Sequence, residues 1–321
     1  MNNDKVEKNI EKLNNILVNC TLCPRMCQIN RAAGEKGFCN LGKEMIISAA
    51  LPHHGEEPPF SGDKGAGTIF FSSCNLRCIY CQNYQISHTT KGYQVSVQQL
   101  SDIMLELQKL GCHNIEPVTP TPHIPGIMEA FLTAKRRGLH LPLVFNCGGY
   151  ERREIISLLS GLVAIYLPDF KYGIAKIGKD LSGVDDYPDQ ALLSLQEMVD
   201  QVGDTLTLDE NKIAVSGIIV RHLVLPGYIE NSIEALRMIR RVSASLPLSI
   251  MAQYTPMGAV ENHPFLHRRI TKEEYEWVVH TALDLGFEEI YTQDVDDRTL
   301  NPDFNSDYPF AWSSTGEQTH V

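Results

Sequence analysis

The sequence predicts an α/β fold in which six parallel strands are joined by crossover helices. After residue 67, short apolar or β-branched runs alternate with segments of helical periodicity, which is the pattern of strand–helix units. A polar motif follows every predicted strand, and the C-terminal strand ends of parallel sheets carry the reactive groups. With 321 residues, 43% hydrophobic and 21% charged, the chain suits one large globular domain with an appended module.

The elements are expected in a simple order along the chain. A helix is expected over residues 4–18, where apolar residues recur at helical spacing. Residues 20–66 are rich in Gly, Pro and Cys, so we expect a small loop-rich module that a metal would organise. The strands are expected at 68–72, 114–118, 143–146, 162–167, 217–225 and 248–253. The later helices are expected at 97–110, 124–137, 151–160, 190–202, 232–242 and 272–285. This gives an N-terminal helix and Cys-rich module (1–66), a core of strand–helix units (67–295) and a polar tail (296–321).

The charge balance and the N-terminal segment limit the expected partners and location. Lys and Arg number 28 against 39 Asp and Glu, a net charge of −11, and the basic clusters are only short pairs, so nucleic acid is not an expected partner. No apolar run approaches the roughly 18–20 residues that a membrane span requires. The first residues are polar and lack the apolar core of a secretion signal. We therefore expect a cytoplasmic protein without a membrane partner.

The cysteines are crowded, with seven of the nine between Cys20 and Cys81, which indicates metal binding or catalysis in a chain without a signal segment. Three of them form the segment Cys74-Asn-Leu-Arg-Cys78-Ile-Tyr-Cys81, directly after the first predicted strand. Three thiolates on one loop suit three irons of a cubane cluster and leave the fourth iron open. The alternative is zinc, which in a closed site needs a fourth ligand. His88 is the nearest histidine after the trio that could supply it.

A second group of four cysteines precedes this trio. Cys20, Cys23, Cys27 and Cys39 have the spacing C-x2-C-x3-C-x11-C. Four thiolates suit either a closed structural zinc or a second [4Fe–4S] cluster, and the spacing does not separate the two. A second cluster would relay electrons to the first, whereas zinc would only fold the module. We favour iron and sulfur because the trio already requires cluster loading.

The trio matches the cluster motif of the radical S-adenosylmethionine (SAM) superfamily, and Tyr80 matches the aromatic residue usual before its last cysteine. The chain further resembles the pyruvate formate-lyase activating enzyme-like branch with an N-terminal cysteine module. This resemblance covers residues 20–290 and is carried by segments 20–27, 37–39, 81–83, 118–123, 168–172, 221–227 and 253–256. It implies a partial (β/α)6 radical SAM barrel with a small N-terminal Cys-rich metal-binding module. It also implies that an open iron chelates SAM and that a reduced [4Fe–4S] cluster cleaves it, giving a 5′-deoxyadenosyl radical that takes a hydrogen atom from the substrate.

The resemblance also marks candidate contacts for SAM at the strand ends. Where the superfamily commonly has Gly-Gly-Glu, this chain has Thr119-Pro-Thr-Pro-His123, so the contacts to the SAM amino group are expected to differ. The candidate SAM-binding residues are Tyr80, Thr119, Thr121, His123, Asn146, Asp169, Lys171, Arg221 and His222, and the candidate adenine or substrate contacts are Gln253 and Tyr254. The structural alternatives are a Pro-rich turn, a surface ion pair of Asp169 and Lys171, and a buried pair at the fifth strand. Cys112 and Cys147 are expected to be small buried hydrophobes.

The function expected from this resemblance is the installation of a glycyl radical on a partner protein by hydrogen abstraction. Six parallel strands do not close as eight do, which leaves a lateral opening for a protein loop. The expected partners are a glycyl radical enzyme and a low-potential electron donor such as flavodoxin or ferredoxin. One alternative is radical SAM modification of another protein, peptide or small molecule. The other is a non-catalytic metal-ribbon adaptor, which would leave the strand-end motifs without a purpose.

Overall fold

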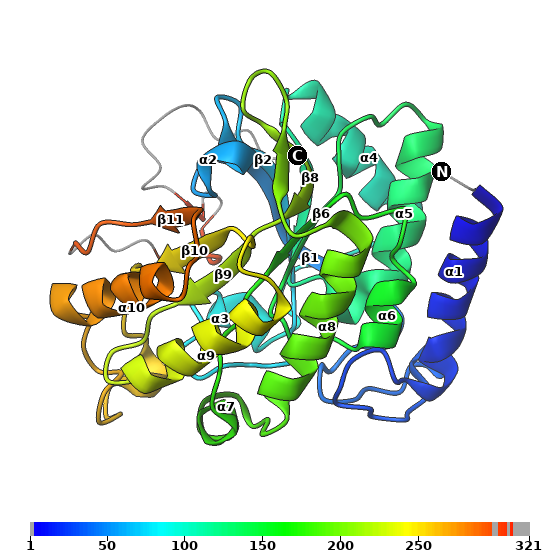
Figure 1. Cartoon of the computed structure of the whole chain (residues 1–321). Helices are drawn as coiled ribbons and strands as arrows, with labels where there is room; N and C mark the ends of the chain where they lie inside the picture. Colours follow the sequence, from blue (N-terminus) through cyan, green and yellow to red (C-terminus); the bar gives the residue numbers. More distant parts are fainter. Residues whose placement is uncertain (1–2, 297–300, 307–308, 311–321) are drawn as a thin grey trace.

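The computed structural model describes residues 3–296, 301–306 and 309–310, and these form a curved sheet with helices along its outer side (Figure 1). Within these residues, an eight-stranded sheet has the order β3-β1-β2-β4-β5-β6-β8-β7 and a three-stranded sheet has the order β11-β10-β9. The strands are β1 (Met45–His53), β2 (Ala66–Phe71), β3 (Tyr93–Val95), β4 (Ile115–Val118), β5 (Val144–Cys147), β6 (Ile165–Pro168), β7 (Leu206–Leu208), β8 (Ala214–Ile218), β9 (Val220–Leu223), β10 (Leu248–Met251) and β11 (Ile290–Thr292). Parallel pairing from β2 through β4, β5 and β6 to β8, and of β9 with β10, confirms the predicted α/β fold with a mainly parallel sheet.

The predicted strand at 217–225 is divided between the two sheets. β8 pairs with β6, whereas β9, which follows β8 after the single residue Ile219, pairs with β10. Gly217 has a φ of +116°, and a Cβ there would lie 2.1 Å from the carbonyl oxygen of Thr205, so the bend requires glycine. A bridge between Asp169 and Arg221 joins the end of β6 to β9. The predicted strands thus follow one another around a single curved wall.

Part of the segment expected to be loop-rich is a strand. β1 spans nine residues within 20–66 and pairs antiparallel with β2 and with β3. Most of its side chains are buried on both faces, because Met45 to Leu51 is almost continuously apolar. The loop-rich part of this segment therefore ends before Met45, and β1 belongs to the main sheet.

The helices follow the predicted order, with two differences in the middle of the chain. The segment 151–160 forms only one short helix, and an additional helix, α7, follows β6. The helices are α1 (Asn3–Ile16), α2 (Pro58–Ser61), α3 (Tyr84–Ser87), α4 (Val97–Lys109), α5 (Ile124–Arg136), α6 (Arg153–Ser157), α7 (Ala175–Ser182), α8 (Tyr187–Val202), α9 (Ile229–Val242) and α10 (Lys272–Asp284). Capping boxes at Ser96 and Thr271 fix the starts of α4 and α10. Among the described residues, no helix is both long and apolar enough to cross a membrane.

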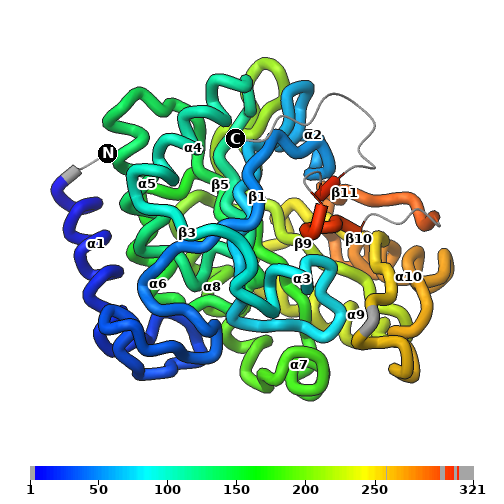
Figure 2. Tube along the Cα trace, turned by 180° about the vertical axis from the view of Figure 1, so that it is seen from behind, coloured from blue at the N-terminus to red at the C-terminus, as the bar shows by residue number. Residues whose placement is uncertain are grey.

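The two ends of the described chain pack on different parts of the sheet. The cysteine-rich loops lie below α1 and beside α6, as both views of the chain show (Figures 1 and 2). Of the tail expected at 296–321, residues 297–300, 307–308 and 311–321 lie outside the described residues. Phe304 and Phe310 in the described part are buried against Phe70 of β2 and against residues of β1. This part of the tail is therefore packed on the core.

Candidate active site

A cavity of about 500 Å³ opens at the C-terminal ends of the parallel strands. Its wall includes the cysteine trio after β2, Thr119 after β4, Asn146 at the end of β5, and Asp169 with Lys171 after β6. Strands β9, β10 and β11 complete the wall. The sequence-predicted site residues that line this cavity are Cys74, Cys78, Tyr80, Cys81, Thr119, Asn146, Asp169, Lys171, Arg221 and Gln253. Parallel topology thus brings residues from six separate segments to one place.

Each sulfur of the trio accepts a hydrogen bond, one from the trio's own loop and two from the helices α3 and α7. The Leu76 amide lies 3.3 Å from Cys74 Sγ and donates to it. The Ser182 hydroxyl donates to Cys78 Sγ at 2.9 Å, and the Ser87 hydroxyl donates to Cys81 Sγ at 3.1 Å. Hydrogen bonds of this kind to cluster sulfurs are one of the means by which a protein sets a reduction potential.

Burial disfavours thiolates at this loop unless a positive centre is present. Burial, together with Cys78, raises the pKa of the Cys81 thiol to about 12 and also raises the pKa of Cys74. A metal centre supplies the charge that deprotonates such thiols. As the described side chains stand, no three His, Cys, Asp or Glu residues converge closely enough to hold an ion. The donor set nevertheless fits a group held by three thiolates, because all three sulfurs face one cavity.

His88, the candidate fourth ligand for zinc, is engaged elsewhere. Its Nε2 atom lies 3.1 Å from the carbonyl oxygen of Cys78 and forms a hydrogen bond with it. His88 is also absent from the described lining of the cavity. The structure therefore leaves the trio as a three-ligand set, which is the arrangement expected for a cluster with one open iron.

Asp169 and Lys171 form an ion pair on the cavity wall. Their side chains are only 21% and 20% exposed, so this is not the open surface pair that was the structural alternative. Burial works against the charged form of Lys171, but Asp169 and the Cys78 thiol outweigh it and raise the lysine pKa. The site thus keeps a protonated amine and a carboxylate close to the trio.

The loop after β5 is fixed by Tyr187. Its hydroxyl lies 2.9 Å from the Gly148 carbonyl oxygen and 3.1 Å from the Asp169 carbonyl oxygen, and it accepts a hydrogen bond from the Lys171 amide at 2.8 Å. Gly149 has a φ of +77°, and a Cβ there would lie 2.0 Å from the Asp169 carbonyl oxygen. The glycines of this loop therefore allow a close approach to the β6 backbone, with Gly149 the strict position.

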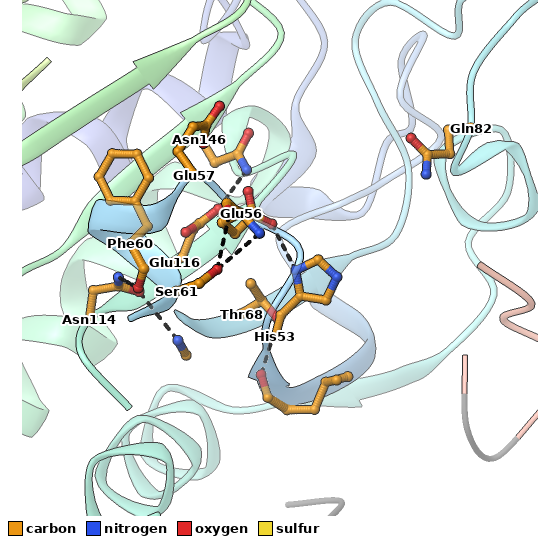
Figure 3. Close-up of polar contacts among 12 residues, drawn as sticks. His53, Glu56, Glu57, Phe60, Ser61, Thr68, Gln82, Asn114, Glu116 and Asn146 are labelled. Atoms are coloured by element: carbon orange, nitrogen blue, oxygen red, sulfur yellow. Dashed lines mark hydrogen bonds and ion pairs between the residues drawn. The ribbon is translucent and has the colours of Figure 1, made fainter. Parts of the chain in front are cut away.

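A group of buried carboxylates surrounds Arg221, and the sequence analysis did not identify it. Arg221 donates from Nε to Glu57 Oε1 at 2.8 Å, and its Nη2 pairs with both Glu56 and Glu57. Asn146 Nδ2 donates to Glu116 Oε1 at 2.7 Å. Figure 3 shows Glu56, Glu57, Glu116 and Asn146 gathered together. The only local signal for this group is the Glu56-Glu57-Pro58 segment before a short helix.

Four of the residues predicted to contact SAM or substrate are absent from the described lining of the main cavity. Thr121 donates to Glu151 Oε1 at 2.6 Å, and His123 Nε2 bonds to the Ser72 carbonyl oxygen at 2.8 Å. His222 bonds to Phe170 and Ser232, and the Tyr254 hydroxyl donates to the Leu266 carbonyl oxygen at 2.6 Å. The side chains of all four residues therefore form hydrogen bonds within the protein, and none is in the described lining of the main cavity.

The four N-terminal cysteines share a second, much smaller cavity. Cys20, Cys23, Cys27 and Cys39 all line a space of about 20 Å³. A Cβ on Gly37 would lie 2.8 Å from Cys27 Sγ, so a larger residue would intrude among the thiols. These loops are compatible with a four-thiolate site, although the described sulfurs do not meet at ion-binding distance as they stand.

Arg25 connects this cysteine module to the loop of the trio. Its Nε donates to the Asn75 carbonyl oxygen at 2.9 Å, and its Nη2 donates to the Ser182 carbonyl oxygen at 2.9 Å. Its guanidinium also lies 3.7 Å above the centre of the Phe38 ring. Ser182 also donates a hydrogen bond to Cys78. Arg25 therefore links the loops of the N-terminal cysteines to two residues that lie beside the trio, Asn75 and Ser182.

Comparison with known proteins finds a matching family and two relatives. The family model described as Radical SAM superfamily matches residues 68–170. An uncharacterized protein of Methanocaldococcus jannaschii, MJ0674, is 30% identical over 291 residues, which are 88% of this chain and 79% of the relative. A second protein of that organism, MJ0808, is 25% identical over 165 residues, 46% of this chain and 48% of the relative.

Two solved structures are also similar. One is the radical SAM methyltransferase TsrM from Kitasatospora setae, with a TM-score of 0.41, 16% identity, and coverage of 61% of this chain and 39% of that one. The other is methylornithine synthase (PylB), with a TM-score of 0.46, 12% identity, and coverage of 78% and 77%. The family match covers the strand and loop that carry the trio, and the alignment with MJ0674 extends over most of both chains. The match over residues 68–170 places this chain in the radical SAM superfamily.

Proposed function

We propose that this protein cleaves SAM reductively and takes a hydrogen atom from a substrate held in the main cavity. The observation that carries the proposal is the gathering of Cys74, Cys78 and Cys81, each with a hydrogen bond to its sulfur, beside Lys171 on one cavity wall. Membership of the superfamily implies a [4Fe–4S] cluster and SAM. When bound, these supply a one-electron reduction that yields methionine and a 5′-deoxyadenosyl radical.

The chain's own residues have separate parts in this reaction. The three cysteines would hold the cluster, and Ser87, Ser182 and the Leu76 amide would adjust the charge on their sulfurs. Asp169 and Lys171 would orient the ammonium and carboxylate groups of SAM, because they offer one charge of each sign. Thr119 and Asn146 would add polar contacts, and Tyr80 and Gln253 would face the adenine or the substrate. The buried wall would keep water from reactive species.

The decisive experiment is anaerobic SAM cleavage by the reconstituted protein with a chemical reductant. We expect 5′-deoxyadenosine from the wild type and from Cys112→Ser, because Cys112 is buried and absent from the described lining of both cavities. We expect none from Cys78→Ser, which lacks one cluster ligand. Equal product from Cys78→Ser and the wild type would refute the proposal.

For the N-terminal module we propose a second [4Fe–4S] cluster that relays electrons to the first. The support is the sharing of one cavity by four cysteines and the Arg25 contacts to Asn75 and Ser182 at the trio. Metal analysis tests it: about eight irons per chain are expected for two cubane clusters. One zinc with only about four irons would assign the module to a structural zinc site instead.

As the target we propose a glycyl radical enzyme, with flavodoxin or ferredoxin as the electron donor. The support is the resemblance of the motifs to the pyruvate formate-lyase activating enzyme-like branch. The test incubates the enzyme with candidate glycyl radical proteins and records electron paramagnetic resonance spectra after SAM turnover. Absence of a glycyl radical signal from every candidate would shift the proposal to radical modification of another protein, peptide or small molecule.

A further inference from the structure

The loop between β1 and α2 gives the main cavity an excess of carboxylates. Among the described lining residues, Glu56, Glu57 and Asp169 face two cations, Lys171 and Arg221. Lys171 pairs with Asp169, so Arg221 has both Glu56 and Glu57 to balance. An uncompensated buried charge is costly. This end of the cavity therefore favours a further positive charge.

Glu116 does not contribute to this excess charge. Glu116 is absent from the described lining of the cavity. Burial, together with the nearby Glu56 carboxylate, also raises the pKa of Glu116 well above its usual range, which favours the neutral carboxyl. Burial alone would also raise the pKa of Glu56, but Arg221 and His53 outweigh it and hold the pKa of Glu56 below its usual range. Glu56 is thus an anionic group of the cavity lining beside Arg221 and His53.

His53 supplies a hydrogen-bond acceptor in the same place. Its Nδ1 lies 3.0 Å from Glu56 Oε1. A carboxylate only accepts hydrogen bonds, so in the neutral ring Nδ1 carries the proton and Nε2 is the acceptor. The other nitrogen, Nε2, lies on the side of the ring away from Glu56 (Figure 3). It is buried and has no hydrogen-bond partner among the described residues, although His53 lines the cavity. A buried acceptor of this kind lacks a donor that a ligand can bring.

Aromatic side chains complete this end of the cavity. Phe70 and Phe310 line the cavity and contact the His53 ring. The Phe310 ring centroid lies 4.5 Å from that of His53 and 5.0 Å from that of Phe70. Aromatic rings attract cations through their faces, and most strongly where water is excluded. The carboxylate, the acceptor nitrogen and the aromatic faces therefore all favour a cationic ligand that can donate a hydrogen bond.

We infer that the subsite formed by His53, Glu56, Phe70 and Phe310 binds an alkylammonium group of the substrate. The group would donate an N–H bond to His53 Nε2, place its charge beside Glu56 and pack its methylenes on the phenylalanines. The inference rests on the proposed radical SAM function and names a substrate class for it. Gln82, which follows Cys81, lies apart from the His53 and Glu56 pair (Figure 3).

The test measures binding to the cluster-reconstituted, SAM-saturated full chain by anaerobic calorimetry. The probe is butylammonium, with butanol and butyrate as neutral and anionic ligands of equal length. We expect saturable binding of butylammonium at least about 10-fold tighter than that of butanol, as for a charge-assisted contact. SAM saturation is part of the design, because SAM is itself cationic and would block the probe if it occupied this subsite.

Substitutions locate the binding within the cavity. Glu56→Gln is expected to weaken butylammonium binding by about 10-fold, and Phe310→Leu and His53→Gln by about 3-fold or more. Glu129→Gln is the matched control, because Glu129 is an exposed residue of α5 and loses the same charge. Far-ultraviolet circular dichroism and cluster absorbance establish that each variant is folded. His53→Gln and Phe310→Leu, which leave the pairs of Arg221 in place, carry the test if Glu56→Gln does not fold.

The ammonium can belong to a free amine or to a lysyl side chain, and capped tripeptides separate these sources. Tight binding of the lysine peptide but not its norleucine counterpart would assign the subsite to a peptide. Tight binding of butylammonium alone would assign it to a small amine.

Equal binding of butanol and butylammonium, or unchanged binding in Glu56→Gln, would overturn the inference. Cleavage of SAM by a wild-type protein that does not bind ammonium would remove the inference and leave the proposed function. Binding of ammonium without SAM cleavage would do the reverse.

Discussion

Replacing Gly149 with alanine should damage the active site through the backbone of β6. Gly149 has a φ of +77°, and the added Cβ would lie 2.0 Å from the Asp169 carbonyl oxygen and 2.7 Å from the Tyr187 hydroxyl. The first of these atoms belongs to the backbone and cannot rotate away. The segment that carries Asp169 and Lys171 must therefore move, or the loop after β5 must.

The cost can be estimated from two contributions. A non-glycine residue in the left-handed region costs about 1–2 kcal/mol, and forced overpacking costs about 1–3 kcal/mol. The sum of about 2–5 kcal/mol is a large part of the roughly 5–15 kcal/mol that stabilises a typical folded protein. At roughly 2 °C per kcal/mol for a large domain, the melting temperature should fall by about 4–10 °C.

The assay is thermal unfolding of Gly149→Ala and Gly148→Ala, followed by circular dichroism under identical anaerobic conditions. Gly148→Ala is the matched control, because its Cβ would meet the flexible ends of two side chains, Leu76 at 3.1 Å and Lys171 at 3.7 Å, and a loss below about 1 kcal/mol is expected. Gly149→Ala should also bind SAM more weakly, since Asp169 moves. A melting temperature of Gly149→Ala within 1 °C of that of Gly148→Ala would refute the reasoning.

Three further predictions follow from single contacts. Tyr187→Phe removes the acceptor of the Lys171 amide, and we expect a loss of about 1–3 kcal/mol in the free energy of unfolding, measured by denaturant titration. Gly37→Ala places a methyl group 2.8 Å from Cys27 Sγ; metal analysis should show loss of the N-terminal metal with the trio still loaded, and full loading of both sites would contradict this. Burial lowers the pKa of His123 to about 4, whereas the unfolded side chain titrates near pH 6.5. The unfolded state therefore binds more protons between these values, and the stability falls as the pH falls, by up to about 1.4 kcal/mol per pH unit. His123→Gln should flatten this dependence, and a wild-type stability that is constant from pH 7 to pH 4 would show the explanation to be wrong.

The parallel strands other than β11 (Ile290–Thr292) could be predicted, because each is a short apolar run followed by a polar motif. β1 could not, because its nearly continuous apolar run lies in a segment whose Gly, Pro and Cys content is typical of loops. Its role depends on pairing with β2, which the local pattern does not encode. Tertiary pairing therefore decided the structure of residues 45–53.

The cysteine trio and the Asp169 and Lys171 pair could be placed at one mouth because the strand ends of a parallel sheet meet there. Thr121 differs, because Thr119 takes a positive φ of 60° and turns the chain after β4. Thr121 then lines the cavity of the N-terminal cysteines. The group of buried carboxylates around Arg221 could not be predicted, because Glu57 and Arg221 lie 164 positions apart in the sequence. No local spacing reveals such a contact.

The contacts of Arg25 have a consequence for how this sequence can diverge. Its three hydrogen bonds all end on main-chain carbonyl oxygens, those of Asn75, Ser182 and Gly183. Every amino acid offers such an oxygen, so the attachment itself places no demand on the identity of the three acceptor residues. Across evolutionary time these acceptors are free to change as far as this contact is concerned, whereas the arginine is not. A descendant that lost Arg25 would have no compensating substitution available at its partners, and the cysteine module would have to be anchored anew.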